Sequence, residues 1–200
     1  FNLGKITPKW GKGYYFNPVA FIDRQKDPNE PQLSREGFTT LNYKYNKVYN
    51  SDLQNIAFDV FYIRTAKNLN DYLYIDDSNI IAMKFYMLYK DIDIDIIYSY
   101  SDKDANKLGI DFSTNIETNF EVHGEYARFD NRYYSYLLGL KYLTEGELTI
   151  LSEYYYQNEA QAQNTPFWDK KYLINSFTQK EPLEFLYLSV YYKNILNISD

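Results

Sequence analysis

The chain has 200 residues, a formal net charge of −6, 20% aromatic residues and no cysteine. This length suffices for one domain of ordinary size, which we expect to span residues 1–200. The lack of cysteine excludes disulfides and thiolate metal sites, and the lack of a Lys/Arg block argues against a nucleic-acid partner, because neutralising phosphates needs clustered positive charge.

The N-terminal part carries few strand signals. Glycines at positions 4, 11 and 13 interrupt any alternation, so a first strand is expected only near residues 9–16. Residues 17–37 hold three prolines and end at Gly37, which predicts a long loop with a short helical turn at 19–24. The Gly11-Lys12-Gly13 run is not a phosphate-binding loop, because it lacks that motif's spacing and its following helix.

Alternating apolar and polar residues then predict a series of strands joined mostly as hairpins. Eight have clear faces and one, at 183–194, does not. They are expected at 38–46, 55–64, 81–89, 92–100, 108–113, 118–129, 133–143, 147–156 and 183–194. Long loops, foremost 17–37 and 157–181, alternate with short turns, as in an up-and-down outer-membrane barrel.

The clearest strand pair lies in residues 79–101. No stretch of the chain approaches the ~18 apolar residues of a membrane helix, so insertion into a membrane would need strands. A two-residue loop at Lys90-Asp91 makes Tyr89 and Ile92 face each other and puts both apolar stripes on one side. Each strand has about ten residues, the length that a membrane-spanning strand needs.

The apolar face of the predicted sheet is expected to meet lipid. Its lipid-facing residues are Ile81, Met83, Phe85, Ile92, Ile94, Ile96, Leu138 and Leu140. Tyrosines near strand ends on this face, such as Tyr100 and Tyr156, predict aromatic girdles at the headgroup level. Tyrosine is also simply a good strand former.

The opposite face is mostly charged and is expected to line a pore. The predicted pore-lining residues are Lys84, Asp93, Asp95, Asp111, Glu121, His123, Glu125, Lys141, Glu147 and Glu153. Seven of the ten are acidic, so the pore would favour cations. The alternative is that these side chains are the solvated face of a soluble antiparallel sheet.

His123 is the only histidine and lies between Glu121 and Glu125 on one strand face. One His and two Glu along a single strand make a poor set of metal ligands. Ser113 and Ser135 share the face, which leaves a His–Ser lipid hydrolase open, although His123 lies mid-strand rather than at a rim. We expect no enzyme, no metal and no cofactor, and a lumen histidine hydrogen-bonded to a neighbour.

The loop at 157–181 contains Pro166-Phe167-Trp168-Asp169-Lys170-Lys171. These residues could narrow a pore, stack on a sugar or contact lipopolysaccharide. The interpretation that we favour is a loop anchored against the barrel rim by its aromatic side chains.

The architecture resembles the porin-like outer-membrane β-barrels of Gram-negative bacteria. The resemblance covers residues 38–194 by pattern, and the segment 10–18 with Glu36-Gly37 is similar to one that recurs in uncharacterised barrels. It implies an all-β, antiparallel, up-and-down transmembrane barrel in the bacterial outer membrane, in contact with lipid. The end at Asn197-Ile198-Ser199-Asp200 looks like a turn instead of the usual aromatic strand end, so we expect part of a larger barrel.

Strand length, the shared apolar face, the rim tyrosines and the acidic stripes predict a passive outer-membrane channel for small hydrophilic solutes, with a lumen that favours cations. A homo-oligomer stays open. Two other functions also stay open: a soluble β-sheet module that binds carbohydrate, and a structural or assembly barrel without conductance.

Overall fold

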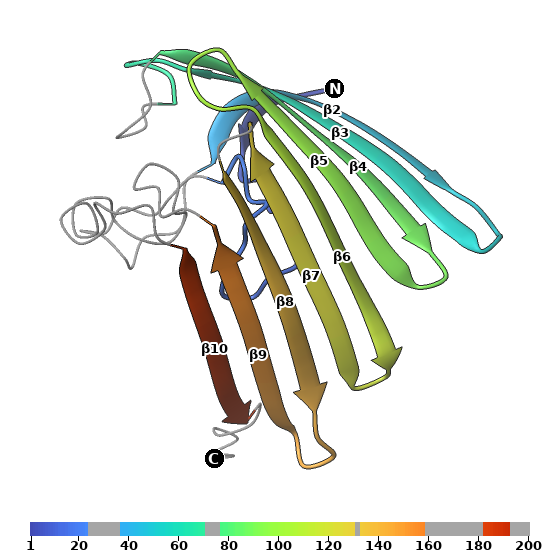
Figure 1. Ribbon diagram of the computed structural model, residues 1–200. Helices are drawn as coiled ribbons and strands as arrows, with labels where there is room; N and C mark the ends of the chain where they lie inside the picture. The colour runs from blue at the N-terminus through green and yellow to red at the C-terminus, as the bar shows by residue number, and fades with distance from the viewer. Residues whose placement is uncertain (24–36, 71–76, 131–132, 159–181, 193–200) are drawn as a thin grey trace, which may run out of the picture.

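The computed structural model describes residues 1–23, 37–70, 77–130, 133–158 and 182–192. They form one sheet of ten antiparallel strands in chain order (Figure 1). The strands are β1 (Asn2–Ile6), β2 (Phe38–Val48), β3 (Leu53–Thr65), β4 (Ser78–Tyr89), β5 (Ile92–Ser101), β6 (Lys107–Glu117), β7 (Phe120–Phe129), β8 (Tyr133–Leu143), β9 (Leu148–Gln157) and β10 (Leu183–Tyr192). The expected all-β, up-and-down sheet is confirmed, with β1 and β10 as its edges in the described residues.

The hairpin between β4 and β5 turns where the sequence predicts. Lys90 and Asp91 have φ angles of 49° and 61°. Positive φ at both central residues gives a turn whose twist matches that of the flanking strands. Tyr89 pairs with Ile92 in the register, which confirms that the two apolar stripes share one face.

The expected first strand near residues 9–16 is wrong. The N-terminal strand is instead Asn2–Ile6, which pairs with β2. Pro8 has no N–H to give to a sheet ladder, and the chain leaves the sheet there. The expected helical turn at 19–24 is also wrong over residues 19–23, which form hydrogen-bonded turns, while residue 24 lies outside the described part.

Strand β6 runs further than its alternation indicates. Residues beyond Ser113 continue the ladder with β7, through an irregularity between Asn115 and Glu117. Thr118 and Asn119 therefore make the turn, whereas the expected strands 108–113 and 118–129 had left residues 114–117 between them as the turn. This strand ends where its pairing with β7 ends, and the local sequence pattern does not show which strand it pairs with.

Residues 7–23, called the strap below, lie on the concave side of the curved sheet (Figure 1). The main apolar core is the layer between strap and sheet. Trp10, Val19 and Ile22 of the strap are buried there with Phe61 of β3, Ala127 of β7 and their neighbours. The sequence predicted only a loop for part of this segment.

The described residues include no helix that is long and apolar enough to cross a membrane. The loop with Trp168 and most of the predicted loop at 17–37 lie outside the described residues.

Candidate functional site

Two buried glutamates hold the strap against the sheet, and Glu125 of β7 is the first. Its Oε1 atom accepts hydrogen bonds from the backbone N–H groups of Lys12 and Gly13, each 2.6 Å away. Its Oε2 atom accepts a third from Val19 N–H, at 3.2 Å. Only 4% of Glu125 is exposed, so the strap N–H groups stand in for water around this carboxylate.

Glu153 of β9 is the second anchor and is fully buried. Its Oε1 atom accepts a hydrogen bond from Tyr14 N–H at 2.6 Å, and Oε2 accepts from Tyr15 N–H at 2.9 Å and Phe16 N–H at 3.1 Å. Five consecutive strap N–H groups, from 12 to 16, thus end on two carboxylates. A segment that crosses the face of a sheet needs such acceptors, and hydrogen bonds to charged groups are the stronger kind.

His123 of β7 supports the second anchor. Its Nε2 atom lies 3.1 Å from Glu153 Oε1, and its Nδ1 atom lies 3.3 Å from Glu121 Oε1. The ring crosses β8 above Gly139, where a Cβ atom would lie 1.9 Å from Nε2. Glycine at this position is therefore what lets the imidazole reach β9.

Three acidic residues form a row across the sheet beneath the strap. Asp95, Asp111 and Glu125 are register partners on β5, β6 and β7. The ammonium groups of Lys12 and Lys84 each lie 3.4 Å from Asp95 Oδ2. Asp111 is buried, and neither of its carboxylate oxygens has a hydrogen-bond partner among the described residues.

Glycine also makes room for the strap further along the sheet. A Cβ atom on Gly109 of β6 would lie 2.9 Å from Val19 Cγ1 and 3.0 Å from Phe21 Cζ. Ile97 and Ala127 are the register partners of Gly109 on either side, and both are fully buried. The small residues Gly109 and Ala127 therefore leave room on the sheet for this part of the strap.

Aromatic side chains fix the middle of the strap against the last strands. Phe16 stacks on Tyr155 of β9, with ring centroids 5.0 Å apart. Tyr15 stacks on Tyr187 of β10 at 4.0 Å. Each such aromatic pair contributes about 0.5–1.5 kcal/mol beyond the stabilisation that comes from its buried area. This contribution comes in addition to that of the hydrogen bonds.

Tyr14 is the most exposed of these strap aromatics and joins two charged side chains. Its hydroxyl donates to Glu121 Oε2 and accepts from Lys141 Nζ, both at 2.8 Å. Burial, as the largest cause, raises the pKa of the Tyr14 hydroxyl.

Most of the predicted pore-lining residues do lie together on the concave face. Those that hold the strap, or contact its anchors, are Lys84, Asp95, Glu121, His123, Glu125, Lys141 and Glu153, and Asp111 lies in the same acidic row. Asp93 lies on β5 two residues before Asp95 and accepts a hydrogen bond from the Tyr86 hydroxyl. Glu147 is different: it is exposed in the turn before β9, with φ at 62°, and does not join the cluster.

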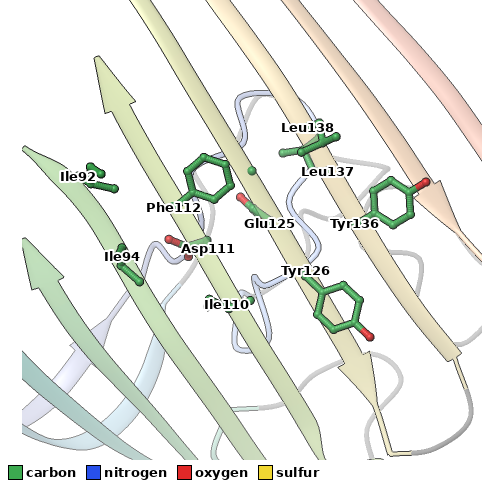
Figure 2. Close-up of a pocket in the computed structure, with 11 residues that line it drawn as sticks. Ile92, Ile94, Ile110, Asp111, Phe112, Glu125, Tyr126, Tyr136, Leu137 and Leu138 are labelled. Carbon is green, nitrogen blue, oxygen red and sulfur yellow. The ribbon is translucent and has the colours of Figure 1, made fainter. Parts of the chain in front are cut away.

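The predicted lipid-facing residues lie on the opposite, convex face. Ile81, Phe85, Ile96, Leu138 and Leu140 are exposed, and Met83, Ile92 and Ile94 are partly exposed. On this face Phe112 and Leu138 stand on the strands beside β7 (Figure 2). A hollow of about 500 Å³ with an almost wholly apolar lining lies here, and Phe112, Gly124 and Leu138 are among the residues that line it. It offers no convergent polar groups to orient a soluble substrate.

The structure places the groups around His123 that the sequence considered for a metal site or for a His–Ser pair. Its ring nitrogens face Glu153 and Glu121, although Ser113 is its register partner. Among the described residues, no three His, Cys, Asp or Glu side chains are placed to hold a metal ion. The residues that the sequence analysis missed are those of the strap, together with Gly109 and Gly139. Glycine in mid-strand was the available signal, because it often marks a close approach of another segment.

No protein-family model matches the chain, and searches of curated proteins and of solved structures found no similar protein. The resemblance to porin-like barrels therefore stays a prediction from pattern. A functional proposal has to be argued from the two faces of the sheet and from the strap.

Proposed function

We propose that this chain forms part of the wall of an outer-membrane β-barrel channel for small hydrophilic solutes, with the strap inside the lumen. The observation that carries the proposal is the convex face. Ile96, Leu138 and Leu140 are 48%, 55% and 47% exposed at the centre of strands of ten or more residues. Soluble monomers rarely expose contiguous apolar patches of more than a few hundred Å².

The apolar side chains of this face form a continuous band. One register row runs through Met87, Ile94, Phe112, Gly124 and Leu138. The next row runs through Phe85, Ile96, Ile110, Tyr126 and Tyr136, and it continues onto β9 at the partly exposed Tyr156. An outward apolar band flanked by aromatic residues is the surface that outer-membrane barrels present to lipid.

Tyrosines gather at one end of the band. The rings of Tyr126 and Tyr134 lie 6.1 Å apart, and those of Tyr136 and Tyr156 lie 5.1 Å apart. Rings with an apolar body and a polar hydroxyl suit the headgroup region. The cluster supports the predicted aromatic girdle on this part of the wall.

The lumen side of the proposal differs from what the sequence suggested. Four of the seven acidic residues expected to line the pore are almost fully buried: Asp95, Asp111, Glu125 and Glu153. Glu125 and Glu153 bind strap N–H groups, and Asp95 is paired with Lys12 and Lys84. We therefore propose a narrowed lumen in which the expected cation preference is weak while the strap is docked.

A pore needs a closed wall, and in the described residues β1 and β10 are the edges of an open sheet. An unpaired edge is a template for further strands. The proposal therefore includes additional strands that pair with β1 and β10. A second copy of the chain could provide these strands.

A soluble carbohydrate-binding module is less well supported. Its apolar stripes would pack against one another, whereas here they are exposed on the convex face. A structural barrel without conductance would have the same wall, so only transport separates it from a channel.

The deciding experiment is reconstitution of the protein in planar lipid bilayers. We expect it to need detergent for solubility and to give stepwise ohmic conductance after insertion. Full solubility without detergent would contradict the membrane assignment. Stable insertion with no conductance would leave the structural barrel as the better description.

A further inference from the structure

We propose that the strap sets the charge that a permeating solute meets, by shielding the acidic row of the sheet. With the strap docked, the carboxylates are withheld from the lumen. With the strap displaced, they face the lumen and make the channel cation-selective. The inference rests on the proposed channel function and names the element that determines its selectivity.

The shielding follows from where the carboxylates end. Glu125 and Glu153 each accept three strap N–H groups. Asp111 lies between Glu125 and Asp95 in the register, and 1% of it is exposed. Its carboxylate oxygens meet no hydrogen-bond donor among the described residues, and burial withholds them from the lumen.

Displacing the strap also changes the balance of charge. Lys12 belongs to the strap and leaves with it, so Asp95 keeps only Lys84 as an ammonium partner. Glu121 and Lys141, at the rim of the cluster, lie 3.9 Å apart and largely offset each other. The surface uncovered on release is therefore strongly acidic, and rings of acidic side chains favour cations.

The strap is held to the wall by side chains and not by strand pairing. It is not a strand of the sheet, and six of its backbone N–H groups end on the side chains of Glu125 and Glu153. It can therefore be moved by substitutions that alter no charge and break no strand pairing.

Gly109→Val is the variant that tests this. Its side chain would occupy the space of Val19 and Phe21 while every charged group stays. Gly4→Val is the matched control, because it adds the same side chain to a strand glycine with nothing within 4 Å of the added Cβ atom. In bilayers with a KCl gradient, we expect the K⁺/Cl⁻ permeability ratio to rise several-fold in Gly109→Val and to stay at the parent value in Gly4→Val.

Strap position is measured separately by thiol labelling, since the chain has no native cysteine. Asp111→Cys should react slowly with a positively charged thiol reagent in the parent and rapidly when combined with Gly109→Val. Glu117→Cys, at an exposed site, should react rapidly in both. If Gly109→Val fails to fold, Trp10→Ala with Val19→Ala loosens the strap from its own side and is measured in the same way.

The outcomes separate the inference from the channel proposal. Rapid labelling of Asp111→Cys in the parent overturns the inference, because the strap then shields nothing. Strap release with an unchanged permeability ratio also overturns it, while the channel stands. No conductance in parent and variants overturns the channel function and with it the selectivity inference, whatever the labelling reports of the strap.

Discussion

His123 on β7 and Glu153 on β9 approach to 3.1 Å across the intervening strand β8. The approach is open because Gly139 of β8 has no side chain beneath the imidazole. Glu153 in turn accepts the backbone N–H groups of three strap residues. One glycine thus links the pairing of three strands to the docking of a segment more than 100 residues away.

Gly139→Ala should break this link. The added Cβ atom would lie 1.9 Å from His123 Nε2, so the ring has to leave Glu153. Overpacking of this kind typically costs about 1–3 kcal/mol, measured as the free energy of unfolding in detergent. Gly146→Ala is the control, since its Cβ atom would meet nothing closer than 3.9 Å. Equal stability of the two variants would show that His123 does not need its position.

Glu153→Gln should loosen the strap without changing side-chain size. One acceptor oxygen becomes an NH₂ donor that faces the N–H groups of residues 14–16, so at least one buried donor loses its partner. Such a loss costs about 1–3 kcal/mol, and amide hydrogen exchange should accelerate at residues 14–16. Exposed Glu117→Gln should leave both measurements unchanged. Unaltered exchange in Glu153→Gln would remove Glu153 as an anchor.

The sequence could predict the sheet because a strand's period is local. Alternation placed the faces of most strands, and the Lys90-Asp91 turn fixed the register of Tyr89 with Ile92. The alternation fails at Glu147, where a positive φ delays the strand by one residue. A period of two indicates which side chains share a face but not whether water or lipid meets that face.

The strap could not be predicted for the same reason. Its hydrogen-bond partners, Glu125 and Glu153, are 106 to 139 residues away in the chain, and no local pattern encodes such pairs. Buried carboxylates and pore-lining carboxylates look alike in a sequence. Only Gly109, a glycine within a strand that lies against Val19 and Phe21, indicated that another segment comes close to this face.

Asp95→Lys is a substitution on which sequence and structure disagree. As a lumen residue, Asp95 should accept a lysine with little loss of stability. In the structure it pairs with Lys12 and Lys84 at 3.4 Å each, so the change would gather three ammonium groups in a buried site. We expect a clear loss of folding stability, partly restored by adding Lys84→Met. No loss in the single variant would mean that the site is open to solvent.

Acid sensitivity should come in part from Asp102, which follows β5. Its carboxylate accepts hydrogen bonds from Asn79 N–H at 2.9 Å and from the Ser78 hydroxyl at 2.8 Å. Hydrogen bonds, first that from the Asn79 backbone, lower the pKa of Asp102 to about 2. Because the pKa is lower in the folded state, this contribution to stability is present above the ordinary value near 3.8 and is lost as the pH falls towards 2.

Asp102→Asn should therefore flatten the dependence of the unfolding midpoint on pH between about 5 and 2, the window that follows from the shifted pKa. Asp52→Asn removes a carboxylate from an exposed ion pair with Lys90 and should leave the slope of the parent. The same slope in Asp102→Asn as in the parent would mean that other carboxyl groups govern acid unfolding.

Ile96→Lys decides which medium meets the convex face. Ile96 is 48% exposed at mid-strand, and a lysine at the middle of a lipid-facing strand costs about 2–4 kcal/mol, against about 0–1 near the interfaces. Ile116→Lys, at an exposed position near the end of β6, is the matched control for depth. If lipid covers this face, unfolding from lipid vesicles should show a large penalty for Ile96→Lys and a small one for Ile116→Lys. If water covers it, both penalties should stay within about 0.5 kcal/mol, as for ordinary surface substitutions, and the proposed channel would lose its wall.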